Sequence, residues 1–82
     1  MKVKLVCVTW VDARTDGGWF EHDPKKPRPN PPLKSYGLLV ERNENAVIIA
    51  STYDPECNRW SDRMEIPAGM LKSVRTIKTV EA

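Results

Sequence analysis

The sequence predicts an all-β fold, and three observations carry this prediction. Segments rich in Val, Ile, Thr and aromatic residues, which favour strands, recur along the chain. Gly, Asn, Asp and Pro, the residues typical of turns, separate these segments. No stretch of about ten residues has the apolar spacing of an amphipathic helix. The length of 82 residues predicts a single domain over residues 1–82.

The first predicted strand covers residues 2–11. Val6, Val8 and Trp10 alternate onto one face of this segment. The opposite face is also mostly apolar. We therefore expect a central strand that is covered on both faces. The cover comes from the rest of the fold, or partly from a neighbouring chain.

Residues 12–35 are predicted to form one long loop. Its segment from residue 23 to residue 32 is rich in proline. Proline fixes φ and lacks a backbone N–H, so neither a helix nor an inner strand runs through such a segment. We expect an extended, polyproline-like surface loop, and connections of this length are often functional or disordered.

The next predicted element is a β-hairpin. Residues 35–42 and 46–53 form its strands, and Asn43–Asn45 supplies a tight turn. Gly37 predicts a bulge or a sharp bend in the first of these strands.

The last third of the chain predicts two more strands. Residues 60–66 form the first, Pro67–Gly69 interrupts the chain with a single 3-10 turn, and residues 71–79 form the second. Residues 79–82 are predicted to be a flexible tail.

This order of elements is that of a small five-stranded SH3-like, or Sm-like, barrel. The long loop falls between strands one and two, and the one-turn segment precedes the last strand. An OB-fold is the nearest competitor, but it carries a helix between its third and fourth strands. Residues 53–61 are too short and too rich in turn residues for that helix.

Short motifs in the chain resemble those of small proteins encoded by bacteriophages and prophages. They are Trp10-Val11-Asp12-Ala13, Asp16, Trp19, Ser35 and Gly37 before a Leu-Val-Glu strand, and Ile66-Pro67. The resemblance spans residues 6–77. It implies a phage or bacterial origin and a small β-barrel, with no assigned activity and no catalytic residues. The Pro-rich insert at 23–32 is longer and more basic than is usual in those proteins.

The basic Pro-rich loop is the leading candidate site. Basic side chains beside aromatic ones can hold a phosphate backbone while bases stack on the rings. A solvated, stiffened connection is nevertheless the interpretation that we favour for this loop. Residues 26–32 also fit the spaced-proline pattern that SH3 and WW domains read. The candidate binding residues are Trp19, Phe20, Lys25, Lys26, Arg28 and Lys34.

Three other groups have alternative interpretations. Two acidic residues of the loop, Asp12 and Asp16, favour turn hydrogen bonds over the metal site that they could form with Glu21, His22 and Asp23. Cys7 is expected in the core and Cys57 in an exposed turn. Trp60 is expected in the core, although with Tyr36 and Tyr53 it could form an aromatic platform.

Composition and charge favour a binding protein over an enzyme. The net charge of +2 permits an anionic partner without requiring one, and the chain has one histidine. We expect no catalytic residues, no metal and no cofactor. With no secretory leader or membrane segment apparent, we expect a cytoplasmic protein, of a bacterial host if phage-encoded.

The predicted function is that of a small non-catalytic binding or accessory protein. It would act through protein–protein contacts, with a partner or with a second copy through open strand edges. Nucleic-acid binding by the basic Pro-rich loop is one alternative, and a structural role in a phage particle is another.

Overall fold

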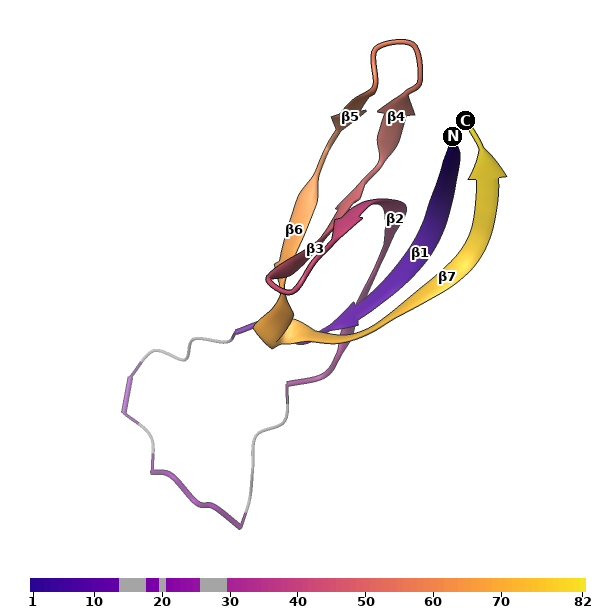
Figure 1. The fold of residues 1–82 in the computed structure, drawn as a ribbon. Helices are drawn as coiled ribbons and strands as arrows, with labels where there is room; N and C mark the ends of the chain where they lie inside the picture. The colour runs from indigo at the N-terminus through magenta and orange to yellow at the C-terminus, as the bar shows by residue number, and fades with distance from the viewer. Residues whose placement is uncertain (14–17, 20, 26–29) are drawn as a thin grey trace.

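The computed structural model describes residues 1–13, 18–19, 21–25 and 30–82. Within these residues the chain forms strands and one short 3-10 helix (Figure 1). In chain order, the elements are β1 (Lys2–Trp10), β2 (Leu33–Arg42), β3 (Ala46–Ala50), β4 (Thr52–Asp54), β5 (Arg59–Ser61), β6 (Met64–Pro67), η1 (Ala68–Met70) and β7 (Leu71–Glu81). The all-β prediction is confirmed.

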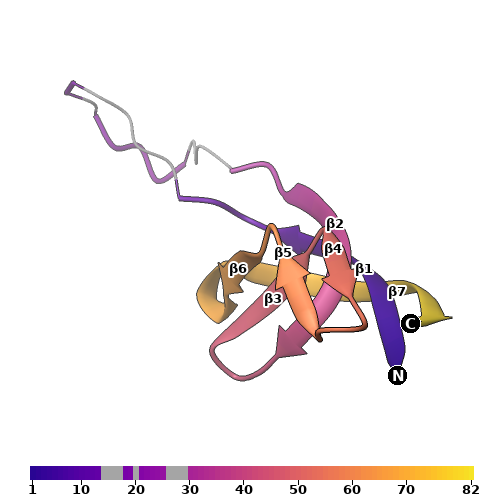
Figure 2. The same cartoon turned by 90° about the horizontal axis from the view of Figure 1, so that it is seen from above.

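Five strands form one antiparallel sheet in the order β6-β3-β2-β1-β7. The first and last strands of the chain are therefore neighbours; β1 is an inner strand paired with β2 and β7, and β2 is the middle strand. β6 and β7 are the two edges of this sheet and do not pair with each other within the described residues. The sheet curls but is not closed as a barrel (Figure 2).

The hairpin formed by β3 and β6 continues beyond a short interruption. Ile49 pairs with Met64 in the main sheet, and Thr52 pairs with Ser61 in the two-stranded sheet of β4 and β5. Both strands thus advance by three residues, and the register is kept across the break. At the break Asp62 adopts a left-handed φ of 55°. The predicted strands 46–53 and 60–66 are each divided here, because such a conformation interrupts the extended ladder.

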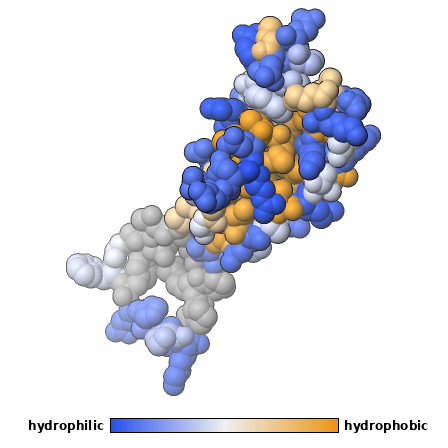
Figure 3. All heavy atoms as spheres, viewed as in Figure 1, coloured by the Kyte–Doolittle hydropathy of each residue, from blue (hydrophilic) through white to orange (hydrophobic). Residues whose placement is uncertain are grey.

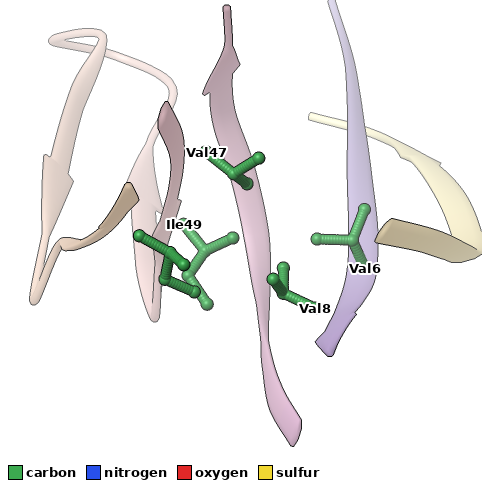
Figure 4. Packing of buried hydrophobic residues seen from close by; sticks show 5 residues of the cluster. Val6, Val8, Val47 and Ile49 are labelled. Atoms are coloured by element: carbon green, nitrogen blue, oxygen red, sulfur yellow. The ribbon is translucent and has the colours of Figure 1, made fainter. Parts of the chain in front are cut away.

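The core lies where β1, β3 and β6 face one another. Val6 and Val8 of β1 pack with Val47 and Ile49 of β3 and with Ile66 of β6 (Figure 4). Half-buried apolar side chains surround this cluster; they are Trp10, Leu39, Met70, Leu71 and Val74. In space-filling view, hydrophobic residues gather over the middle strands and hydrophilic residues border them (Figure 3).

The long strands contain register shifts, but none of these shifts lies at Gly37. The sequence predicts a bulge or a sharp bend at Gly37. The register of β1 with β2 passes through Gly37 without a shift, so the bulge is wrong. The shift in β2 falls between Leu39 and Glu41 instead. Gly37 is required by a close approach: an added Cβ would lie 3.0 Å from the Ala50 carbonyl oxygen and 3.2 Å from Cβ of Ile49.

Hydrogen bonds donated by backbone N–H groups fix the turn after β2 and the start of η1. Asn43 makes the predicted tight turn, and its side-chain oxygen accepts from the N–H groups of Asn45 and Ala46 at 2.8 and 3.0 Å. The N–H of Ala68 donates to the Asn45 carbonyl at 2.8 Å, which ties η1 to this turn. The predicted 3-10 turn before the last strand is therefore confirmed, starting at Ala68.

The ends of two predicted segments differ from the structure. The long connection covers residues 11–32 rather than 12–35, because β2 already begins at Leu33. Residues 79–81, predicted as part of a flexible tail, belong to β7, which pairs with β1 as far as Glu81. The N–H of Ala82 also donates to the Met1 carbonyl at 2.9 Å. The C-terminal residues are held by pairing with β1, and local sequence gives no sign of this long-range pairing.

Candidate binding site

Hydrogen bonds join the two ends of the long loop where it leaves the sheet. At its base the indole N–H of Trp10 donates to the hydroxyl of Ser35 at 2.9 Å. Further out, the side-chain amide of Asn30 donates to the Asp12 carbonyl at 3.0 Å. These contacts join residues 25 and 18 positions apart in the chain. The described residues between them lie away from the sheet in both views (Figures 1 and 2).

A shallow, mostly apolar pocket of about 260 Å³ lies at the base of the loop. Leu33, the first residue of β2, contributes an exposed apolar side chain to it. The pocket is lined by Asp12, Ala13, Asn30, Pro31 and Leu33. It is a place where an apolar side chain of a partner could lodge beside the loop.

Trp19 is the most exposed large apolar side chain among the loop residues that the structure describes. Its relative exposure is 101%, so the described residues leave the indole uncovered. Farther along, the Asp23 carboxylate accepts from the N–H of Lys25 at 2.9 Å and holds a turn. This is an Asx turn, in which an Asp side chain bonds the backbone N–H two residues further along the chain. The loop thus carries the exposed indole of Trp19, followed along the chain by a turn that contains Lys25.

The structure describes three of the six predicted binding residues, and these three do not share one element. Trp19 and Lys25 are exposed on the loop, whereas Lys34 is exposed on β2 within the sheet. Phe20, Lys26 and Arg28 lie outside the described residues. Lys34 therefore belongs to the surface of the sheet and not to the loop.

The acidic and cysteine candidates occupy separate places. Asp12 makes the expected turn contact, accepting from the N–H of Ala13 at 2.8 Å, while Asp16 lies outside the described residues. No cluster of three possible metal ligands occurs among the described residues. Cys7 is buried and Cys57 is exposed, as predicted, and both thiols are free.

Two of the three aromatic residues considered as a platform come together. The rings of Tyr53 and Trp60 lie 4.3 Å apart between centroids, tilted by 37°. They are a cross-strand pair of β4 and β5. Trp60 is half-buried in this pair and is not part of the core cluster. Tyr36 lies on β2 as the cross-strand neighbour of Cys7.

Sequence reasoning missed a second pocket, of about 280 Å³, where β2, β3 and β6 meet. The hydroxyl of Ser51 donates to the carboxylate of Asp62 at 3.1 Å on its wall. Tyr36 and Met64 add exposed apolar surface. The break at Asp62, which brings these residues together, has no signal in the local sequence, because Asp is common in ordinary turns.

Among the described residues, Tyr36 has a perturbed pKa. Its pKa is raised above 10.0, first by a side-chain hydrogen bond with Cys7, then by the charge of that thiol and by desolvation. The charge of Arg75 on β7 acts in the opposite direction and lowers this pKa. Tyr36 on β2 is therefore influenced by side chains of the adjacent strand β1 and of β7, the strand beyond it.

No protein-family model matches the chain, and no match was found among curated proteins or solved structures. The resemblance to phage-encoded proteins consequently stays a prediction. In the part of the chain that the structure describes, no helix has the length and apolar character needed to cross a membrane.

Proposed function

We propose that this chain is a non-catalytic binding module that engages a protein partner through the loop between β1 and β2. The observation that carries the proposal is the full exposure of Trp19 on that loop. Tryptophan is enriched among the residues that dominate binding energy at protein interfaces. Covering an exposed aromatic side chain of this size contributes on the order of 2 kcal/mol or more to association.

The placement of reactive side chains supports a non-catalytic role. Nucleophilic catalysis by a cysteine needs a base beside the thiol. Cys7 is buried in β1, and His22, the sole histidine of the chain, is exposed on the loop. Cys57 is exposed in the turn between β4 and β5, so neither thiol lies on the loop that carries this histidine.

The proposed fold type is SH3-like. Its support is the strand order β6-β3-β2-β1-β7, in which the last strand pairs with the first, together with the long first loop and η1 before β7. In this arrangement a stable sheet fixes the two limbs of a long loop, which suits recognition by loop residues.

Capture from bacterial lysate with tagged chains tests the function. The wild-type chain, Trp19→Ala and Ile77→Ala would be compared; Ile77 is an exposed apolar residue of β7 and serves as the matched control. We expect a specific protein to be retained by wild type and Ile77→Ala and to fall at least about tenfold with Trp19→Ala. With the purified partner, Trp emission should shift to the blue on binding. Equal capture by all three chains, or no specific capture by wild type, would show the proposal to be wrong.

A further inference from the structure

The register of three strands places a set of cations on one face of the sheet. Directly opposed residues of antiparallel strands point to the same side. Tyr36, Cys7 and Arg75 form one such row across β2, β1 and β7. The neighbouring rows are Lys34–Thr9–Ser73 and Leu38–Leu5–Lys78. We call this surface the basic sheet face.

The side chains of the basic sheet face divide into a covered centre and an exposed border. Cys7 is only 3% exposed, while Tyr36 beside it is 61% exposed. Lys34, Arg75 and Lys78 are exposed around them. Within the three rows that the register defines, no residue is acidic. An exposed ring on β2 thus shares a sheet face with three cations, and the three rows themselves hold no carboxylate. The Asp62 carboxylate, which lines the second pocket together with Tyr36, lies outside these rows and accepts a hydrogen bond from the Ser51 hydroxyl.

The charges on β7 also disfavour the pairing of this edge strand with a second copy of the chain. β7 is a sheet edge, and edge strands invite pairing with another strand. Lys72, Arg75 and Lys78 all lie on this strand. Pairing two copies of β7 would bring these like charges together, which is one way in which proteins protect their edges.

We propose that the basic sheet face binds single-stranded nucleic acid, with Tyr36 as the stacking platform and Lys34, Arg75 and Lys78 as contacts to phosphates. Proteins that bind single strands combine a basic surface with aromatic rings, because every base has a face that can stack. An acidic peptide would satisfy the cations but would leave the ring of Tyr36 without a planar partner. A duplex would keep its bases stacked inside and would also leave Tyr36 unused.

The proposal is tested by fluorescence anisotropy with labelled 15-residue oligo-dT and oligo-rU. Binding at low salt should weaken as salt rises, with a log–log slope of roughly −2 for three phosphate contacts. Removing any one of the three cations should make this slope less steep by about 0.7. Tyr36→Ala should weaken binding about tenfold or more, whereas Tyr36→Phe keeps the ring and should bind like wild type.

Two double variants separate this face from net charge. Arg75→Ala/Lys78→Ala removes two positive charges from β7, and Lys2→Ala/Lys4→Ala removes two from β1. Lys4 alternates with Leu5 along β1 and so points away from the basic sheet face. Only the first variant should lose affinity, by about tenfold or more. Equal losses in both would show that binding follows net charge, and would overturn the proposal.

Two competitors test the class of ligand. Poly-glutamate and a DNA duplex should displace the labelled oligonucleotide poorly. Displacement by poly-glutamate as good as by unlabelled oligo-dT, or absence of oligonucleotide binding at low salt, would also overturn the proposal. Trp19→Ala should leave oligonucleotide affinity unchanged, so this inference and the proposed protein-binding function can fail independently.

Discussion

The indole N–H of Trp10 donates a 2.9 Å hydrogen bond to the hydroxyl of Ser35. This contact joins the last residue of β1 to the third residue of β2, at the point where the long loop leaves the sheet. It therefore closes the loop with a side-chain bond between residues far apart in the chain.

Removing this bond should loosen the base of the loop. Ser35→Ala leaves the half-buried indole N–H without its partner, and we expect the free energy of unfolding to fall by about 1 kcal/mol. The midpoint of urea denaturation measures it. Ser73→Ala, an exposed serine of β7, is the control and should change stability by less than about 0.5 kcal/mol. If both variants unfold at the wild-type midpoint, the contact does not stabilise the fold.

Gly37 and Gly69 should respond in opposite ways to the same substitution. Gly37→Ala places a Cβ 3.0 Å from the backbone oxygen of Ala50, which cannot rotate away, so we expect a loss of about 1–3 kcal/mol. Around Gly69 the added Cβ meets nothing within 4 Å. Gly69→Ala should therefore be neutral or stabilise by up to about 1 kcal/mol, by restricting the unfolded chain. Thermal unfolding of the two variants checks this; an equal effect at both sites would argue against the close approach.

Two isoleucines provide a test of where the core lies. Ile66 is 2% exposed in the core cluster, and Ile77 is 45% exposed on β7. We expect Ile66→Ala to cost about 2–5 kcal/mol, because it removes buried methyl groups and leaves a cavity. Ile77→Ala should cost less than about 1 kcal/mol. Denaturant titration of both variants gives the comparison, and similar costs would place the core elsewhere.

The raised pKa of Tyr36 predicts a pH dependence. The folded chain holds the phenolic proton more tightly than the unfolded chain, whose pKa is near 10.0. The resulting stabilisation is complete below about pH 10 and is lost as the pH rises through the raised pKa. In a Tyr53→Phe background, the ultraviolet absorbance of ionised tyrosine reports Tyr36 alone.

The same titration identifies the cause of the shift. Adding Cys7→Ala removes the hydrogen bond and the thiol charge, so the pKa of Tyr36 should fall towards 10.0. Adding Arg75→Ala removes the opposing charge and should raise it further. A titration curve that neither substitution moves would contradict the side-chain arrangement at this row.

Much of the strand content could be predicted because it depends on local signals. The alternation of Val6, Val8 and Trp10 marks the inner face of β1. Asn43 marks the turn between β2 and β3, because its side chain accepts hydrogen bonds from that turn. The candidate site could be predicted only in part. Trp19 and Lys25 are exposed loop residues, as a Pro-rich segment suggests, but Lys34 belongs to a sheet surface. The other cations of that sheet face, Arg75 and Lys78, come from the far end of the chain, and only the strand register places them there.

By itself, then, the sequence determined that this chain forms strands, where its main turns fall and that a long proline-rich connection separates β1 from β2. These features follow from backbone preferences of single residues and from side-chain alternation, which act over a few positions. Only the tertiary structure decided that the sheet stays open, that β7 pairs with β1 to its end, and that Gly37 serves a close approach rather than a bulge. Those outcomes depend on which strands become neighbours and in which register, and a one-residue change of register moves every side chain to the opposite face.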